Sequence, residues 1–292
     1  MDAGALHPRL RSFVEGNYYK ECKSVREELK DVMRPHIGDN HTIYIVSNTT
    51  HGLLAILSYL ATSRNLIDTS DYLYPGFEFL QRDTASEGQW SVKTHICPVT
   101  GNALSKNELL GDRVVVDGAQ SFFTASHHPA LLHAKVFIAP FHKNLGIQVG
   151  MGMLAISDDV DSRQIHDVAK AAESGAGNIN LMLTALNNLK AEGGSLYNCT
   201  VINNDKEILD FAKRYQIEIV TPPGLYGPFV CLKTDAGSPL PEIFHKFGFE
   251  TKYFPSHGVL RVSKLSPGPL ESKIDFSKVF FEALQYTVGH NG

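Results

Sequence analysis

The chain has 292 residues, of which 43% are hydrophobic and 20% charged, a composition typical of globular proteins rather than of disordered or fibrous ones. The net charge of -4 gives no support for a nucleic-acid partner. No apolar run approaches the roughly 18 residues of a membrane-spanning helix, and residues 1–16 lack the apolar core of a signal peptide. We therefore expect a cytoplasmic protein that binds neither membranes nor nucleic acids.

Strand and helix patterns alternate in the N-terminal part of the chain. Hydrophobic residues at helical spacing predict a helix over residues 20–35, a β-branched run predicts a strand over 42–46, and a helical pattern covers 53–60. Further strands are predicted over 72–74, 91–97, 113–117, 135–139 and 151–156, followed by helices over 160–172 and 180–189. Apolar strands that alternate with helices predict an α/β fold, with a largely parallel sheet covered by helices on both faces.

The pattern changes after residue 194. Helices are predicted over residues 205–215 and 274–288, and short strands over 217–220, 228–232, 250–254 and 259–262. We therefore predict a large α/β domain with an N-terminal helix over residues 1–194, and a small α+β domain over residues 195–292.

Asp117 ends the apolar strand pattern over residues 113–117. An unpaired carboxylate in such a place is costly, and ligands of open α/β sheets bind beyond the carboxyl ends of the strands. Asp117 could therefore pair with a positively charged ligand atom, such as a protonated pyridine nitrogen. Capping of the following turn would explain the same residue equally well.

Lys143 lies shortly after the next apolar strand pattern, over residues 135–139. A lysine beside a low-dielectric cleft can lose its proton and attack a carbonyl, although most lysines are solvated surface residues. An acid and an amine at one sheet edge suit pyridoxal phosphate. The acid would keep the ring nitrogen protonated, and the amine would form a Schiff base with the aldehyde.

A polar turn over residues 47–50 joins a predicted strand to a predicted helix. Backbone N–H groups and hydroxyls at a helix N-terminus bind phosphate, whereas an ordinary Ser or Thr cap has the same sequence pattern. Alone, this turn does not distinguish between the two.

These three strings, in this order, resemble the fold-type-I pyridoxal-phosphate enzymes, closest to the class-V aminotransferase and cysteine-desulfurase group. The resemblance covers about residues 42–263. Residues 117–120 are similar to the D-x-A-Q motif of that group, which implies Asp117 on the pyridine nitrogen and Gln120 near the ring hydroxyl. His142 and Lys143 are similar to its H-K signature, which implies His142 near the phosphate and Lys143 as the Schiff-base lysine.

The same resemblance implies further cofactor and substrate residues. Its phosphate loop would comprise Asn48, Thr49 and Thr50. Arg261 resembles the arginine that binds the substrate carboxylate, which a guanidinium can do through two hydrogen bonds; a surface ion pair is the alternative. Phe77, with Tyr74 as the other candidate, would stack on the cofactor ring, although core packing would explain either aromatic residue.

Residues 173–178 are similar to the loop that reaches the cofactor phosphate of a partner subunit, which implies a homodimer with shared active sites. The sequence also departs from the group's pattern. Pro140 stands where a phosphate-binding Ser is usual, and residues 175–177 lack the usual Thr. No Cys lies between residues 239 and 261, which argues against a cysteine desulfurase.

We therefore predict a pyridoxal-phosphate enzyme for an amino acid or another small amino-bearing metabolite, with transamination as the first hypothesis. Elimination at the β- or γ-carbon, or epimerisation, uses the same residues and stays open. A non-catalytic protein that kept the fold is the second alternative, because two phosphate contacts are missing. No metal site is expected, since the spacing of His127, His128, His133 and His142 fits no metal-binding pattern.

Overall fold

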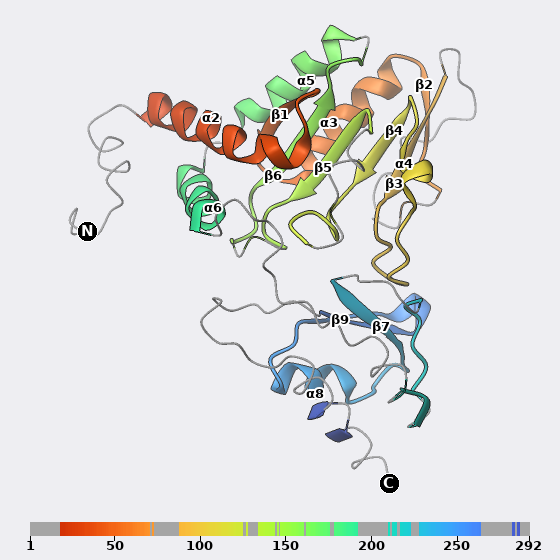
Figure 1. Ribbon diagram of the computed structural model, residues 1–292. Coiled ribbons are helices and arrows are strands. Elements are labelled where there is room, and N and C mark those ends of the chain that lie inside the picture. Colours follow the sequence, from red (N-terminus) through yellow and green to blue (C-terminus); the bar gives the residue numbers. More distant parts are fainter. Residues whose placement is uncertain are drawn as a thin grey trace, which may run out of the picture.

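The architecture is seen in the computed structural model of the chain (Figure 1). The structure describes residues 18–70, 72, 88–124, 127, 134–143, 145, 147–160, 162–175, 178–191, 210, 212–214, 217–222, 228–263, 282–283 and 285–286. Among the helices of these residues, none is both long and apolar enough to cross a membrane.

A larger sheet forms from the strands of the N-terminal part of the described chain. Its strands are β1 (His41–Val46), β2 (Asn65–Asp68), β3 (Gly88–Thr94), β4 (Val114–Asp117), β5 (Val136–Pro140) and β6 (Gly152–Ser157). Their order across the sheet is β1-β6-β5-β4-β3-β2. β6 runs antiparallel to both of its neighbours, and the other neighbouring strands are parallel. All strands except β6 therefore point the same way, which confirms the predicted largely parallel sheet.

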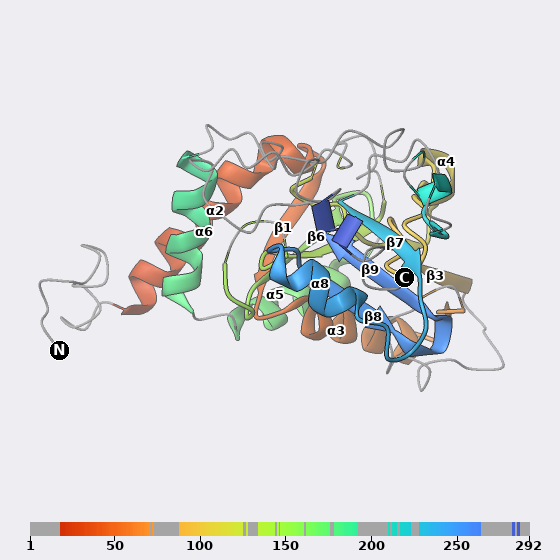
Figure 2. The same ribbon diagram turned by 90° about the horizontal axis from the view of Figure 1, so that it is seen from below.

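Helices cover both faces of this sheet. They are α2 (Tyr18–Ile37), α3 (Thr49–Thr62), the short α4 (Lys106–Leu109), α5 (Arg163–Ser174) and α6 (Ile179–Ala191). Successive side chains of a strand point to opposite faces. Val114 and Val116 pack in the core that contains α2 and α6, whereas Val115 packs in the core that contains α3 and α5. Strand β4 is therefore buried on both sides, which explains its continuous run of valines. Figure 2 shows the two helix pairs on different sides of the strands.

A smaller antiparallel sheet follows in the C-terminal part. It contains β7 (Phe229–Lys233), β8 (Thr251–Phe254) and β9 (Val259–Ser263) in the order β7-β9-β8, with α8 (Leu240–Lys246) and a short 3-10 helix (Pro255–His257) between strands. One face packs on α8 through Leu232, Phe244 and Leu260. The other face packs through Phe229 against Ile96, which follows β3. The smaller sheet therefore lies against the edge of the larger sheet at which β3 ends (Figure 1).

Some predicted elements differ from the structure. The strand predicted over residues 72–74 is wrong at Tyr72, which is not in a strand, and residues 73–74 lie outside the described part of the chain. The sheet instead contains β2, which was not predicted. The strand predicted over 217–220 is only an isolated bridge between Ile219 and Leu232. Helices α4 and α8 are additional to the prediction.

Two predicted helices and the predicted domain boundary fall mostly on residues outside the described part of the chain. Within the helices predicted over 205–215 and 274–288, residues 210, 212–214, 282–283 and 285–286 are described, and all are helical. The boundary between residues 194 and 195 lies outside the described residues. The division into domains 1–194 and 195–292 stays a prediction.

Candidate active site

Three of the predicted site segments follow strands that end at the same edge of the larger sheet. β1, β4 and β5 run in the same direction, so their carboxyl ends lie together. The ladder pairs Val46 with Gly152 and Gly152 with Pro140, while Asp117 pairs with Ile138. Residues 48–50, Asp117 and residues 142–143 therefore follow neighbouring parts of one edge, which is where open α/β sheets bind ligands.

Asp117 is buried at the end of β4, with 8% of its surface exposed. One carboxylate oxygen accepts a hydrogen bond from the backbone N–H of Ala119 at 2.8 Å, and the other accepts from the hydroxyl of Tyr72 at 2.8 Å. Burial raises the pKa of Asp117, while the Ala119 N–H, the positive charge of Lys143 and the Tyr72 hydroxyl lower it. A positively charged ligand atom placed against Asp117 would therefore favour the ionised carboxylate.

A network of short hydrogen bonds fixes the turn after Asp117. The backbone N–H of Gly118 donates to Ile138 O at 2.8 Å, which ties the turn to β5. His95, which follows β3, donates its backbone N–H to Asp117 O at 2.9 Å, and its Nδ1 lies 2.7 Å from Ser121 Oγ. Burial lowers the pKa of His95 to about 4, so this imidazole is neutral at pH 7. The turn that carries Gln120 is thus held by both neighbouring strands.

Lys143 lies beyond the end of β5. Its side chain is exposed, and it lines the cavity between the two sheets. The cavity walls exclude much of the water around the amine, while a ligand in the cavity can still reach it. Burial by these walls lowers the pKa of Lys143 to about 8; the charge of Asp117 opposes this shift, and the charges of Arg261 and Lys252 add to it. An amine of this pKa is partly neutral near pH 7, and the neutral form can attack a carbonyl.

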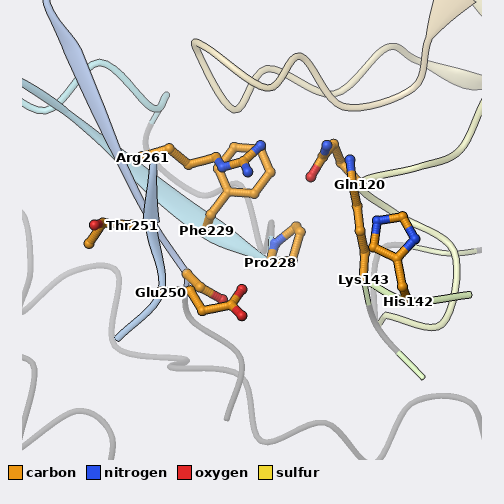
Figure 3. Close-up of a pocket in the computed structure, with 9 residues that line it drawn as sticks. Gln120, His142, Lys143, Pro228, Phe229, Glu250, Thr251 and Arg261 are labelled. Atoms are coloured by element: carbon orange, nitrogen blue, oxygen red, sulfur yellow. The ribbon is translucent and has the colours of Figure 1, made fainter. Parts of the chain in front are cut away.

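The cavity lies between the edge of the larger sheet and one face of the smaller sheet (Figure 3). Its volume is about 260 Å³, slightly below the roughly 300–1,000 Å³ of small-molecule sites. The larger sheet contributes Gln120, His142 and Lys143. The smaller sheet and its flanks contribute Pro228, Phe229, Glu250, Thr251, Arg261 and Ser263.

Arg261 projects from β9 across this cavity toward Gln120 and Lys143 (Figure 3). Its guanidinium lies over two aromatic rings, 5.1 Å from the ring centre of Phe229 and 5.7 Å from that of Phe254. Such cation–π contacts orient a guanidinium and leave its N–H groups available for an anion. Burial lowers the pKa of Arg261, but an arginine stays charged at neutral pH.

The structure brings only part of the predicted site to this cavity. Gln120, His142, Lys143 and Arg261 line it. Asp117 is not among its lining residues and lies close enough to Lys143 to shift the pKa of the amine. Burial and the charge of Lys143 lower the pKa of His142, and the charge of Glu250 opposes them.

The predicted phosphate loop does not line the cavity. Asn48 instead caps α3, since its side chain accepts a hydrogen bond from the backbone N–H of His51 at 2.7 Å. Thr49 and Thr50 form the first residues of that helix. Phe77 and Tyr74, the candidates for stacking on the cofactor, lie outside the described residues.

Several residues of the site were not predicted from the sequence, and two of them carry polar groups that matter for its chemistry. Tyr72 donates to Asp117, and Glu250 lines the cavity beside Arg261. Tyr72 follows β2 at the edge that holds the other site residues, so recognition of this strand in the sequence would have indicated it. Glu250 has no comparable signal, since its place depends on how the two sheets face each other.

The structure also bears on the predicted subunit-bridging loop, on the thiol of Cys231 and on metal binding. Glu173 belongs to α5 and is buried, where it pairs with Lys30 at 2.9 Å and accepts from the backbone N–H of Ile45 at 2.7 Å. Cys231 is fully buried, and burial raises the pKa of its thiol to about 12, so it is no nucleophile at neutral pH. No group of three His, Cys, Asp or Glu side chains within the described residues could hold a metal ion.

Comparison with solved structures establishes the fold. Aspartate aminotransferase of subgroup IV from Thermus thermophilus superposes with a TM-score of 0.63 at 14% identity, covering 97% of each chain. Apo cysteine desulfurase from Thermococcus onnurineus NA1 superposes with a TM-score of 0.69 at 14% identity, over 93% of this chain and 85% of that one. 8-amino-7-oxononanoate synthase from Francisella tularensis superposes with a TM-score of 0.61 at 14% identity, over 98% of this chain and 93% of that one. The fold is therefore that of the fold-type-I pyridoxal-phosphate enzymes.

Sequence comparison gives a narrower result. No curated protein matches the chain. A protein-family model does match nearly all of it, over residues 1–286, and its description is a family of unknown function, DUF6024. The chain therefore belongs to the DUF6024 family.

Proposed function

We propose that this protein is a pyridoxal-phosphate-dependent enzyme that acts on an amino acid or another amino-bearing metabolite, most simply as an aminotransferase. One observation carries the proposal. A buried carboxylate, Asp117, and an amine with a lowered pKa, Lys143, interact at one edge of a fold-type-I sheet, and the amine faces a cavity. The resemblance of residues 117–120 and 142–143 to class-V motifs supports the same conclusion.

The residues present fit pyridoxal phosphate. Asp117 would hold the ring nitrogen, because a protonated pyridine would supply the positive charge that its burial calls for. Gln120 would lie near the ring hydroxyl and His142 near the phosphate, both of them on the cavity wall. Asn48, Thr49 and Thr50 at the start of α3, together with Phe77, complete the proposed cofactor site. Lys143 would carry the covalent bond to the cofactor.

Bound pyridoxal phosphate would act as an electron sink for bond cleavage at the substrate α-carbon. The chain supplies the groups that direct this chemistry. Asp117 would keep a proton on the ring nitrogen. Lys143 would take a proton from the substrate α-carbon, and its pKa of about 8 suits a general base near neutral pH. Arg261, oriented by the rings of Phe229 and Phe254, binds the substrate carboxylate.

Two alternatives remain as hypotheses. Elimination or epimerisation needs the same cofactor and the same lysine, so the site residues do not separate it from transamination. A non-catalytic role is favoured by one observation, that residues 48–50 do not line the cavity. We further propose a homodimer with shared active sites, from the similarity of residues 173–178 to a subunit-bridging loop, and a cytoplasmic location.

An absorption spectrum tests the proposal directly. The purified chain mixed with pyridoxal phosphate should absorb in the visible range, and borohydride should abolish that band and attach the cofactor to the peptide that contains Lys143. Lys143→Ala should remove both signals. Lys252→Ala, which changes a lysine near the same cavity, should keep them. A wild-type chain that gains neither a visible band nor a borohydride-fixed label would refute the proposed cofactor.

Product analysis then separates the reactions. Transamination predicts one keto acid and one pyridoxamine phosphate for each turnover of the first half-reaction. Ammonia or racemised substrate without pyridoxamine phosphate would point to elimination or epimerisation instead. A protein that binds the cofactor and converts no amino acid would support the non-catalytic alternative.

A further inference from the structure

Glu250 lies on the same face of the smaller sheet as the carboxylate-binding candidate Arg261. The backbone N–H of Ser263 donates to Glu250 O at 2.9 Å, so these two residues lie opposite each other where β8 begins and β9 ends. Lys252 pairs with Arg261 two positions further along the ladder. Because alternate residues of a strand share a face, the side chains of Glu250, Ser263 and Arg261 all belong to the cavity-facing side, and all three line the cavity.

Glu250 and Arg261 are not in direct contact. They are diagonal neighbours, which are typically about 7–8 Å apart in an antiparallel pair, and the structure shows no ion pair between them. The guanidinium lies over the rings of Phe229 and Phe254 instead. Within the described residues the Glu250 side chain has no hydrogen bond or ion pair. Figure 3 shows its carboxylate directed into the cavity toward the wall that carries His142 and Lys143.

The negative charge of Glu250 acts on the other groups of the cavity. It opposes the lowering of the pKa that burial causes in His142 and in Arg261. The Glu250 carboxylate is exposed, so water solvates it when the cavity holds no ligand. A ligand that fills a volume of about 260 Å³ displaces this water, and a desolvated carboxylate without a partner is strongly unfavourable.

The geometry points to Glu250 as the binding residue for a positively charged group of the substrate. This inference rests on the proposed function, in which Lys143 meets the reacting amine and Arg261 the carboxylate. The substrate class is then an amino acid whose side chain ends in a cation. An apolar side chain of the same length leaves Glu250 desolvated and unpaired, so such substrates are discriminated against.

Calorimetric titration of the full chain without cofactor tests this assignment apart from catalysis. The two probes are ε-aminocaproate, which has a carboxylate and a terminal ammonium group, and caproate, which has the carboxylate alone. We expect ε-aminocaproate to bind at least tenfold more tightly, which corresponds to about 1.4 kcal/mol. Glu250→Gln should make the two affinities equal. Glu242→Gln, an exposed acid of α8 that does not line the cavity, should keep the difference.

Three outcomes would overturn the assignment. They are equal affinity of the wild-type chain for both probes, a preference that survives in Glu250→Gln, and no measurable binding of ε-aminocaproate at millimolar concentration. A failure of the proposed function gives a different result. In that case the chain does not form a borohydride-fixed bond with pyridoxal phosphate, whatever the titrations show.

Discussion

The lowered pKa of Lys143 makes a quantitative prediction about its reactivity. With a pKa of about 8, roughly one Lys143 amine in eleven is neutral at pH 7, whereas the ordinary pKa of about 10.4 leaves roughly one in 2,500. The ratio of neutral fractions is about 200. A less basic amine is also a weaker nucleophile, and a Brønsted slope like the roughly 0.4–0.5 of thiols reduces the advantage about tenfold. We expect Lys143 to react about 20 times faster in the folded chain than in the unfolded chain.

Trace labelling with isotopic acetic anhydride measures this difference. The folded chain is labelled without cofactor over a series of pH values. It is then unfolded, and the remaining amines are acetylated completely with the other isotope. After digestion, the peptide that contains Lys143 is quantified by mass spectrometry. The same peptide from a chain labelled in urea provides the reference rate. The labelling rate of folded Lys143 should reach half its maximum near pH 8.

Asp117→Asn is the matched variant for this experiment. The carboxylate of Asp117 raises the pKa of Lys143, so its removal should move the labelling midpoint to lower pH. A wild-type midpoint near pH 10, equal to that of the unfolded chain, would refute the argument that the cavity walls desolvate this amine. A midpoint that rises in Asp117→Asn would refute the electrostatic contact between the two residues.

Two further predictions concern stability and are tested by urea unfolding. Tyr72→Phe removes a hydrogen bond to Asp117 and should lower the unfolding free energy by about 1.5 kcal/mol in the pH range where Asp117 is ionised; the loss should shrink as the pH falls through the raised pKa of Asp117, because the neutral acid accepts a weaker bond. An equal loss at every pH would show that the hydroxyl does not act on the carboxylate. Lys30→Met leaves the buried Glu173 unpaired and should cost about 3–5 kcal/mol, whereas Glu173→Gln should cost less, because Lys30 keeps its ion pair with Glu27. The reverse order would contradict this assignment of partners.

The sequence predicts best those strands whose burial leaves a continuous apolar run. β4, β5 and β6 are buried at every position, so each contains a hydrophobic run of at least three residues. β2 was missed because it lies at the edge of the sheet, has only four residues, and begins and ends with polar side chains. The β-branched residues of 217–220 predict a strand there. In the structure only Ile219 forms a bridge, so the pattern overestimates the pairing of this segment.

The same reasoning explains which site residues could be predicted. Asp117 and Lys143 follow neighbouring parallel strands, so their proximity follows from sheet topology. Arg261 was assigned from a family resemblance alone, because a separate sheet carries it. No local pattern specifies how the face of one sheet turns toward the edge of another. Glu250 was missed for this reason, although it lines the same cavity.

The two sheets contribute differently to the charges of the cavity, and this difference has a testable consequence. Arg261 lowers the pKa of Lys143 across the cavity. A carboxylate bound to Arg261 neutralises that influence, so it should raise the pKa of Lys143. The substrate would thereby make the amine a stronger base at the moment when a proton has to be removed. Saturating caproate should move the labelling midpoint of Lys143 to higher pH, and Arg261→Gln should move it in the same direction without ligand. A midpoint that caproate leaves unchanged, although the titration shows it bound, would mean that the carboxylate binds elsewhere and that the arginine acts on Lys143 without receiving the substrate.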